Sequence, residues 1–137
     1  MNILFLLTPK TKLEFLYSDS TIRQAMEKVD LYKYSVLPLI NRDGTYAGTI
    51  SEGDLIRFIK NECNFDIKKA ESVKLTDVPK YRPYEAVSVD VNLDDLVNTA
   101  LNQNFIPIID DRNMFIGIVK RKEIILHYYN QSNNENK

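Results

Sequence analysis

The chain has 137 residues, of which 44% are hydrophobic, and this is enough for one compact domain or for two small halves that share a core. Its 18 basic and 19 acidic side chains nearly cancel, so no basic field exists to hold a phosphodiester backbone, and we expect no binding to a nucleic-acid polymer. A single cysteine and a single histidine exclude an intrachain disulfide framework and a His/Cys zinc cluster, and we expect a cytoplasmic protein with no metal site.

The chain opens with the apolar run Ile3–Leu7, and a short strand is predicted at Glu14–Tyr17. No basic residue precedes the apolar run, which falls far short of the roughly 20 residues that span a bilayer. We therefore expect a strand or a packed terminal arm here, and no association with a membrane. The helix predicted next has apolar residues at spacings of three and four, which indicate one buried face: Ile22, Ala25, Met26 and Val29.

A buried strand is predicted at Val36–Ile40, and the Asp-Gly turn after it leads into a second strand at Tyr46–Ile50, as in a β-hairpin. A helix over Glu52–Lys60 closes this first half of the chain. Residues 64–82 mix charged side chains with prolines, and this composition predicts a linker.

The second half of the chain repeats the first, with Pro107 aligned to Pro38 and Gly117 aligned to Gly48. Internal similarity of this kind predicts two copies of one structural unit. The predicted elements of the second copy are a strand at Ala86–Val89, a helix with apolar residues Leu93, Leu96, Val97 and Leu101, strands at Phe105–Ile109 and Phe115–Val119, and a final helix at Arg121–Tyr129. The polar, asparagine-rich residues 130–137 predict a disordered tail.

These elements predict an α+β fold built from two β-α-β-β-α repeats. Because neither copy alone can bury much apolar surface, we expect two halves that pack together and share a core. The expected organisation is a first repeat with its N-terminal strand at 1–63, a linker at 64–82, a second repeat at 83–129 and the tail at 130–137.

Three features recur in the same order in both halves: an apolar-x-Pro-apolar-apolar strand, a tight turn, and a glycine-containing strand end before the last helix. Together they make the chain, from Leu6 to Tyr129, resemble a pair of CBS domains, the units named after cystathionine beta-synthase. The resemblance implies that the repeats pack with pseudo-twofold symmetry and form two clefts for adenosine-containing ligands. It also implies a regulatory protein rather than an enzyme, and a homodimer that acts on an unknown effector protein.

The resemblance places the first cleft at the stretch Gly48–Leu55. In the family, the Ser/Thr of this motif contacts phosphate or ribose, and its aspartate accepts hydrogen bonds from ribose hydroxyls. Ser51 and Asp54 match the motif, with Thr49 beside them, so we expect AMP, ADP or ATP to bind here as a regulatory ligand, with no cofactor required. By the family's pattern the walls of this cleft come from the second repeat: Tyr84, Glu85 and Ala86, and then Asn104, Phe105, Ile106 and Pro107.

The second cleft departs from the pattern, because Lys120 and Glu123 stand where the first cleft has its serine and aspartate. Lys120, Arg121 and Lys122 place three cations at a helix start, where backbone N–H groups favour an anion such as phosphate. This cleft is therefore expected to take a phosphate-bearing ligand, if it binds one at all.

Cyclic di-AMP is the alternative ligand for the second cleft. Some stand-alone CBS pairs that bind it have basic residues at the positions of Arg121 and Lys122, and a linker run similar to Leu75–Pro79. The walls that the resemblance implies for this cleft come from the first half of the chain: Thr8, Lys12, Leu13 and Glu14, and then Ser35, Val36, Leu37 and Pro38.

Simpler roles compete with both assignments. Ser51 and Asp54 have the spacing of a capping box, in which the serine oxygen accepts the N3 amide and the acid accepts the cap amide. Lys120–Lys122 also fit a solvated helix start, and both clefts fit a structural or interaction module that binds no nucleotide. His127 and Cys63 have no partner in a recognisable catalytic motif, and no P-loop, dinucleotide fingerprint or nucleophile elbow occurs, so we predict no catalytic residues.

Overall fold

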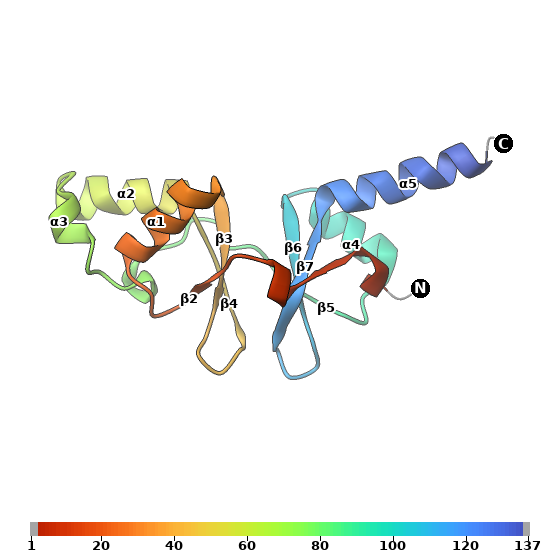
Figure 1. Cartoon of the computed structure of the whole chain (residues 1–137), viewed down its shortest axis with the longest axis horizontal. Helices are drawn as coiled ribbons and strands as arrows, with labels where there is room; N and C mark the ends of the chain where they lie inside the picture. Colours follow the sequence, from red (N-terminus) through yellow and green to blue (C-terminus); the bar gives the residue numbers. More distant parts are fainter. Residues whose placement is uncertain (1–2, 136–137) are drawn as a thin grey trace. The chain divides into compact units, whose positions relative to one another are not determined.

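The computed structural model describes residues 3–135, in which strands and helices alternate along the chain, and this confirms the predicted α+β class. The chain forms two compact units, each with its own sheet and helices (Figure 1). The first-repeat unit comprises Glu14–Pro83, and the second-repeat unit combines the residues up to Leu13 with those from Tyr84 onward. Each unit therefore contains one predicted repeat, but the N-terminal residues belong to the unit of the second repeat.

The first-repeat unit has a three-stranded sheet in the order β2-β3-β4. β2 (Leu16–Tyr17) runs parallel to β3 (Val36–Ile40), and β3 pairs antiparallel with β4 (Tyr46–Ser51), as the predicted hairpin requires. The helices are α1 (Ile22–Tyr32) and α2 (Glu52–Cys63). The sheet and the helices of this unit pack around an apolar core, which includes Leu16, Ile22, Ala25, Leu37, Leu39, Ile50 and Leu55.

The second-repeat unit contains the same hairpin arrangement. β5 (Val87–Ser88) runs parallel to β6 (Phe105–Ile109), and β6 pairs antiparallel with β7 (Phe115–Lys120). The helices are α4 (Leu93–Ala100) and α5 (Arg121–Glu135). The core of this unit includes Ile3, Leu6, Leu96, Ala100, Ile106, Ile108, Val119 and Ile124.

The N-terminal segment completes the sheet of the second repeat, whereas the sequence analysis assigned it to the first. β1 (Leu7–Pro9) pairs antiparallel with β7, so this sheet has the order β1-β7-β6-β5. The residues before it form a short 3-10 helix, η1 (Ile3–Leu6), and not a strand, but they are packed as expected because Ile3 and Leu6 are buried. Pairing with β1 covers hydrogen-bonding groups on the edge of β7 that would otherwise face solvent.

Helix starts follow the local sequence. Thr21 Oγ1 accepts the Gln24 N–H at 3.3 Å at the start of α1, and Asn92 Oδ1 accepts the Asp95 N–H at 2.8 Å at the start of α4. Such bonds satisfy backbone donors that have no partner within the helix. α2 ends at Cys63, and the residue that follows, Asn64, adopts the left-handed conformation that asparagine tolerates better than most residues.

Residues 64–82 are folded onto the first repeat and do not form a free linker. They contain a short helix, α3 (Ile67–Ala70), and a 3-10 turn, η3 (Leu75–Asp77). A bridge between Thr21 and Lys74 attaches the segment to the start of α1. Three of its apolar side chains belong to the core of the first-repeat unit: Ala70, Leu75 and Val78.

The hairpins of both units contain a bulge that depends on glycine. The register shifts between Leu39 and Ile40 opposite Gly48, whose φ is 116°, and the corresponding shift occurs in β6. Gly117, at φ 158°, occupies the matching position, and a Cβ atom there would lie 2.3 Å from the Thr8 carbonyl oxygen. Glycine at this position therefore allows β1 to approach β7.

Pro38 and Pro107 lie in the central strands of their sheets, where a missing N–H is usually not tolerated. The parallel neighbours are short: β2 pairs only with Leu39–Ile40, and β5 pairs only with Ile108–Ile109. Each proline thus lies just before the stretch that the neighbouring strand covers, and it behaves locally like an edge residue.

The last helix is longer than expected, because α5 continues past Tyr129 to Glu135 and takes in most of the predicted tail. The sequence Arg121–Glu135 contains neither proline nor glycine, so no residue ends the helix at the expected position. Residues 136–137 lie outside the described residues. No helix within residues 3–135 is both long enough and apolar enough to cross a bilayer.

We predict that Gly117→Ala lowers the free energy of unfolding by about 1–3 kcal/mol, since the added methyl group collides with the Thr8 carbonyl and displaces β1. Gly53→Ala is the matched control, because Gly53 lies in α2 and its nearest neighbour is the far end of the Arg57 side chain and not backbone. That change should raise stability by up to about 1 kcal/mol. Urea denaturation measures both, and equal effects would contradict the close approach of β1 and β7.

Candidate functional site

Ser51 and Asp54 form a capping box at the start of α2. The Ser51 N–H donates to Asp54 Oδ2 at 3.0 Å, and the Asp54 N–H donates to Ser51 Oγ at 3.1 Å. Two backbone donors at the helix start, which lack partners within the helix, are thereby satisfied. The capping interpretation is confirmed. A capping role does not exclude that the same two side chains also bind a ligand.

Asp54 has further contacts that sequence reasoning missed. Its Oδ1 accepts from Arg57 Nη2 at 2.7 Å and from the Tyr81 backbone N–H at 3.0 Å, and Asp54 is 4% exposed. The Arg57 contact could have been found from its i,i+3 spacing, but no local signal indicates Tyr81. A carboxylate offers about four acceptor sites, so a ligand with two ribose hydroxyls must displace one of these donors.

A cavity of about 330 Å³ adjoins Asp54 in the first-repeat unit. Two cations, Arg57 and Lys80, face it, and each already has a partner, since Lys80 Nζ donates to the Leu75 carbonyl. Burial lowers the pKa of Lys80, while the charges of Asp54 and Asp77 act in the opposite direction. The lining residues are Asp54, Arg57, Phe58, Asn61, Glu62, Pro79, Lys80 and Tyr81.

Residues predicted for different clefts lie on adjacent strands of this unit. Val36 pairs with Ser51, and Pro38 pairs with Thr49, which is 2% exposed. The Ser35 carbonyl accepts the N–H of the first residue of α2 at 2.9 Å. The structure thus brings Thr49, Ser51 and Asp54 together with the stretch from Ser35 through Leu37 to Pro38.

The walls predicted for the first cleft belong to the second-repeat unit, where the structure brings them together. The Tyr84 ring packs 4.8 Å from the Phe105 ring, and Tyr84 Oη accepts the Asn104 N–H at 3.3 Å. Gln103, which the sequence analysis did not select, bonds to both Glu85 and Phe105. Ala86 directly precedes β5, and Ile106 and Pro107 are buried in β6.

The three cations predicted for the second cleft are not equivalent. Arg121 Nε donates to the carbonyls of Ala100 at 2.8 Å and Gln103 at 3.1 Å, so it holds the turn after α4. Lys120 and Lys122 have no ion-pair partner within residues 3–135. The two lysines are therefore the available cations at the start of α5, whose first turn also contains Glu123.

The remaining residues predicted for the second cleft are divided between the units. Thr8, in β1, and Lys12, in the 3-10 turn η2 (Lys10–Lys12), lie with Leu13 in the second-repeat unit. Glu14 lies in the first-repeat unit, where its carboxylate pairs with Lys28.

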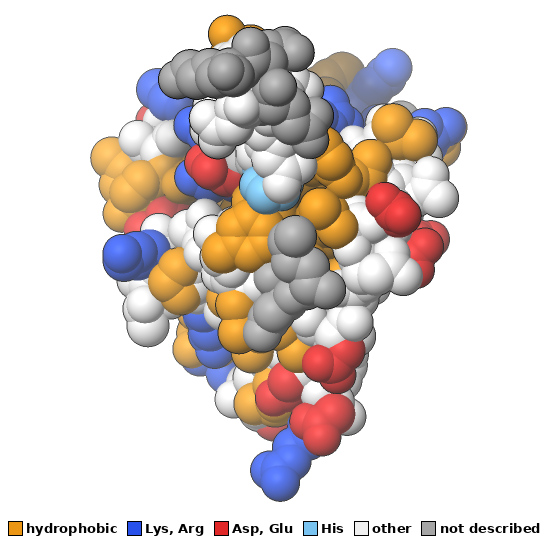
Figure 2. Space-filling model, turned by 90° about the vertical axis from the view of Figure 1, so that its right-hand side faces the viewer, with side chains coloured by type: hydrophobic (Ala, Val, Ile, Leu, Met, Phe, Trp, Pro, Cys, Tyr) orange, Lys and Arg blue, Asp and Glu red, His pale blue; other side chains and the backbone are white. Residues whose placement is uncertain are grey.

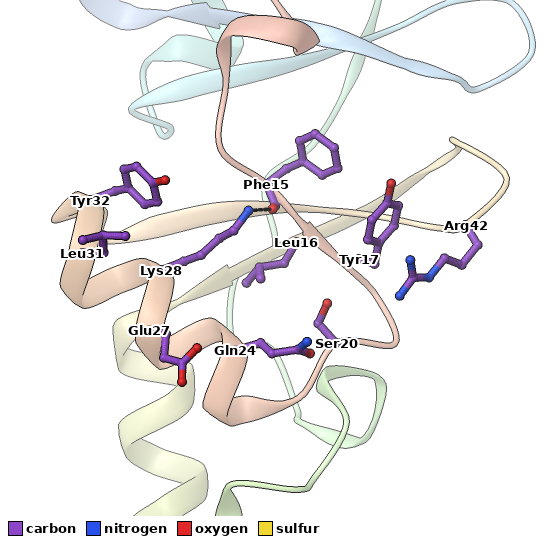
Figure 3. Close-up of a pocket in the computed structure, with 10 residues that line it drawn as sticks. All are labelled: Phe15, Leu16, Tyr17, Ser20, Gln24, Glu27, Lys28, Leu31, Tyr32 and Arg42. Carbon is purple, nitrogen blue, oxygen red and sulfur yellow. Dashed lines mark hydrogen bonds between the residues drawn. The ribbon is translucent and has the colours of Figure 1, made fainter.

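A second cavity, of about 550 Å³, lies beside α1 and β2 and was not predicted (Figure 3). Lys28 Nζ reaches across to the Phe15 carbonyl at 2.6 Å and pairs with Glu14 at 2.9 Å, which lowers the pKa of Glu14. Arg42 pairs with Asp19 at 3.0 Å. Because both cations are paired, this cavity offers little positive charge to a phosphate. Its lining consists of Phe15, Leu16, Tyr17, Ser20, Gln24, Glu27, Lys28, Leu31, Tyr32 and Arg42.

His127 and Cys63 are packing residues in this structure. The His127 ring lies 5.0 Å from the Phe5 ring and 5.6 Å from the Tyr128 ring, and its buried Nε2 has no hydrogen-bond partner in the part of the chain described. Cys63 is buried in the core of the first-repeat unit. Residues 3–135 contain no cluster of three or more histidine, cysteine or acidic side chains placed to hold a metal ion.

The fold has close counterparts among solved structures. CbpB in complex with c-di-AMP is similar with a TM-score of 0.88 and 19% identity, over 99% of this chain and 89% of that chain. CBSX2 in complex with AMP has a TM-score of 0.75 and 23% identity, over 96% of this chain and 98% of that chain. At these identities the similarity establishes the fold.

Sequence comparison gives the family. The Uncharacterized protein MJ1426 of Methanocaldococcus jannaschii is 25% identical over 138 residues, which cover 80% of this chain and 82% of that protein. A family model described as CBS domain matches residues 6–61 and again residues 76–130. Because both repeats match and together make up most of the chain, the protein belongs to the CBS domain family and contains the domain twice.

Proposed function

We propose that this protein is a cytoplasmic regulatory module that binds an adenine nucleotide, with Ser51 and Asp54 holding the ribose-phosphate part. One observation carries the proposal: the second repeat starts α5 with Lys120 and Glu123 at the corresponding positions, so the fold does not need serine and aspartate to begin this helix. Helix capping alone therefore does not account for Ser51 and Asp54, and a ligand contact is the additional role that we propose for them.

The contacts of Asp54 suggest how a nucleotide binds. The carboxylate already accepts three hydrogen bonds, from Ser51 N, Arg57 and Tyr81 N. Arg57 is half exposed and can turn away, whereas the two backbone donors are fixed by the chain. Ribose hydroxyls would take the place of Arg57, whose guanidinium would then be free to approach a phosphate group.

The ligands of similar proteins support an adenine nucleotide. The solved structures of CbpB and CBSX2 contain c-di-AMP and AMP, and both share the fold of this chain. AMP contains the single ribose-phosphate that the Ser51 and Asp54 motif would hold. Cyclic di-AMP is the second candidate, because Lys120 and Lys122 lie at a helix start and have no ion-pair partner among residues 3–135.

Association with a second copy of the chain would pass the effect of nucleotide binding on to an effector protein. Apolar side chains lie beside and below the histidine on one face of the second-repeat unit (Figure 2). Exposed apolar residues there and along α5 include Phe5, Ile125, Leu126 and Tyr129. An exposed apolar surface of this kind is typical of an interaction site, and we propose that it pairs two copies and presents the dimer to an effector protein.

We predict that AMP raises the melting temperature of the protein by several degrees. A ligand that binds only the folded state stabilises it by about 2.7 kcal/mol at roughly one hundred times Kd. A thermal-shift series with AMP, ADP, ATP, cyclic di-AMP and GMP measures this. Unchanged melting with every nucleotide would reject the proposal and favour a structural module that binds none.

Asp54→Asn provides the matched test of the site. The change keeps the side-chain shape but removes the charge that accepts ribose hydroxyls, so we expect the Kd for AMP to rise about tenfold or more. Asp66→Asn is the control, because Asp66 also caps a helix but is exposed. Titration calorimetry well below the melting temperature separates lost affinity from lost stability, and unchanged affinity would leave Asp54 a capping residue only.

Lys122→Ala tests the alternative ligand. If cyclic di-AMP binds at the start of α5, loss of this exposed cation weakens it and makes the remaining binding less sensitive to salt. Lys68→Ala, at another exposed lysine, should have no effect. Equal affinities of both variants for cyclic di-AMP, measured at two salt concentrations, would contradict binding at α5.

Leu126→Lys tests the proposed dimer. We expect the unaltered protein to have the mass of two chains in light scattering, and this variant to have the mass of one, because a charge in an apolar interface is costly. Gln131→Lys, at an exposed polar position on the same helix, should stay dimeric. A monomeric unaltered protein at working concentration would rule out association through this face.

A further inference from the structure

We propose that the groove between α1 and β2 is a separate binding site, which takes a small uncharged aromatic molecule with a hydrogen-bond acceptor. The groove is the cavity of about 550 Å³ described above, and ligand sites measure roughly 300–1,000 Å³. Every residue that lines it belongs to the first-repeat unit, so the site is complete within one unit. It shares no lining residue with the cavity beside Asp54, and it does not depend on the proposed nucleotide site.

A buried hydroxyl without a partner lies on the floor of the groove. Ser20 is 7% exposed, and its backbone N–H and carbonyl are both hydrogen-bonded, but its Oγ makes no hydrogen bond within residues 3–135. Figure 3 shows this hydroxyl pointing from the start of α1 toward β2. Leaving a buried polar atom without a partner costs free energy, so the hydroxyl indicates a place for a polar group of a ligand.

Two further donors lie beside Ser20. Gln24 Oε1 accepts a backbone N–H of its own helix cap at 2.9 Å, while its Nε2 makes no hydrogen bond in the part of the chain that the structure describes. The Ser18 N–H donates to β3, so the N–H of Tyr17, one residue earlier, points to the open edge of the sheet. With these donors the groove suits a ligand that carries an acceptor, such as a carbonyl oxygen.

The charges that line the groove are already balanced. Lys28 Nζ pairs with Glu14 at 2.9 Å, and Arg42 pairs with Asp19 at 3.0 Å. The third charged residue of the lining, Glu27, pairs with an arginine of the same helix. A charged ligand would have to compete with these pairs, whereas an uncharged ligand leaves them intact. The groove therefore favours a neutral molecule.

Aromatic rings form the rim of the groove. The rings of Phe15 and Tyr17 meet edge to face at 5.7 Å, and Figure 3 shows both on the same side of β2. The Arg42 guanidinium lies 3.9 Å from the centre of the Tyr17 ring, which restricts the movement of this ring. Tyr32, 46% exposed, lines the groove from α1. Rings held in this way offer faces and edges to a planar aromatic ligand.

The second repeat builds the same elements without these side chains. Its strand β5 pairs with β6 as β2 pairs with β3, and by this pairing Ala86 and Ser88 stand at the positions of the two aromatic residues. Val91 stands at the position of Ser20, since each donates its N–H to the residue three positions earlier. A repeat therefore folds without the rings and the buried hydroxyl. Their presence in the first repeat is explained by a ligand and not by the fold.

Benzamide is the probe, because it combines an uncharged aromatic ring with one carbonyl acceptor. NMR titration of the isotope-labelled protein should show shifts of the backbone amides of Tyr17, Ser20 and Gln24, with a Kd of about 1–10 mM for so small a molecule. Cyclohexanecarboxamide, which lacks the aromatic ring, and benzoate, which is charged, should each bind about threefold more weakly or worse. Equal or tighter binding of either analogue would overturn the assigned ligand class.

Two variants test the residues of the groove. Ser20→Ala removes the buried hydroxyl and Tyr17→Leu removes the ring, and we expect each to weaken benzamide binding about threefold or more. The controls are Ser72→Ala and Tyr81→Leu, at exposed positions of the same unit outside the groove, which should bind benzamide normally. Circular dichroism confirms that each variant is folded before the titration.

The proposal is overturned if benzamide shifts no resonance, if its shifts lie around Asp54 and not around Ser20, or if both groove variants keep the Kd of the unaltered protein. None of these results depends on AMP. Failure of this site and failure of the proposed nucleotide site are therefore separate outcomes.

Discussion

Asp54 is 4% exposed, and a carboxylate taken so far out of water must be hydrogen-bonded on both oxygens. The chain meets this constraint with donors from three places: the end of β4 at Ser51, the second turn of α2 at Arg57, and the distant Tyr81. One side chain thereby joins the sheet, the helix and the segment that leads toward the second repeat. A ribose that takes the place of Arg57 would change the connection to α2 and leave those to Ser51 and Tyr81, which gives the proposed regulation a physical starting point.

The second repeat begins its last helix by different means. No Ser/Asp pair is present at the start of α5. The first residue of this helix, Arg121, instead donates to the carbonyls of Ala100, at the end of α4, and Gln103, in the connection from α4 to β6. An arginine is well suited to this position because its donors can reach several carbonyl oxygens in fixed directions. The same local fold is thus obtained from two different sets of polar contacts, and only one set leaves a carboxylate beside a cavity.

Much of the fold could be predicted because the repeat pattern is local and occurs twice. The strands Val36–Ile40 and Phe105–Ile109 have the bounds that apolar runs between turn residues predicted. The capping box at Ser51 also followed from spacing alone. The helix α5 was predicted too short, because a polar composition was taken as disorder although no helix-breaking residue interrupts it.

Sequence by itself determined the family, the repeat and the residue types at the candidate site, because these depend on short-range spacing that recurs in both halves. Tertiary structure alone decided that β1 completes the sheet of the second repeat, that Tyr81 bonds to Asp54 and that Gln103 fastens Glu85 to Phe105. These contacts join residues far apart in the chain or depend on burial, and a polar side chain gives no sign in the sequence of which distant backbone group it will meet. Packing decides which distant backbone group each polar side chain meets, since only the folded chain brings the partners within hydrogen-bonding distance and excludes water from them.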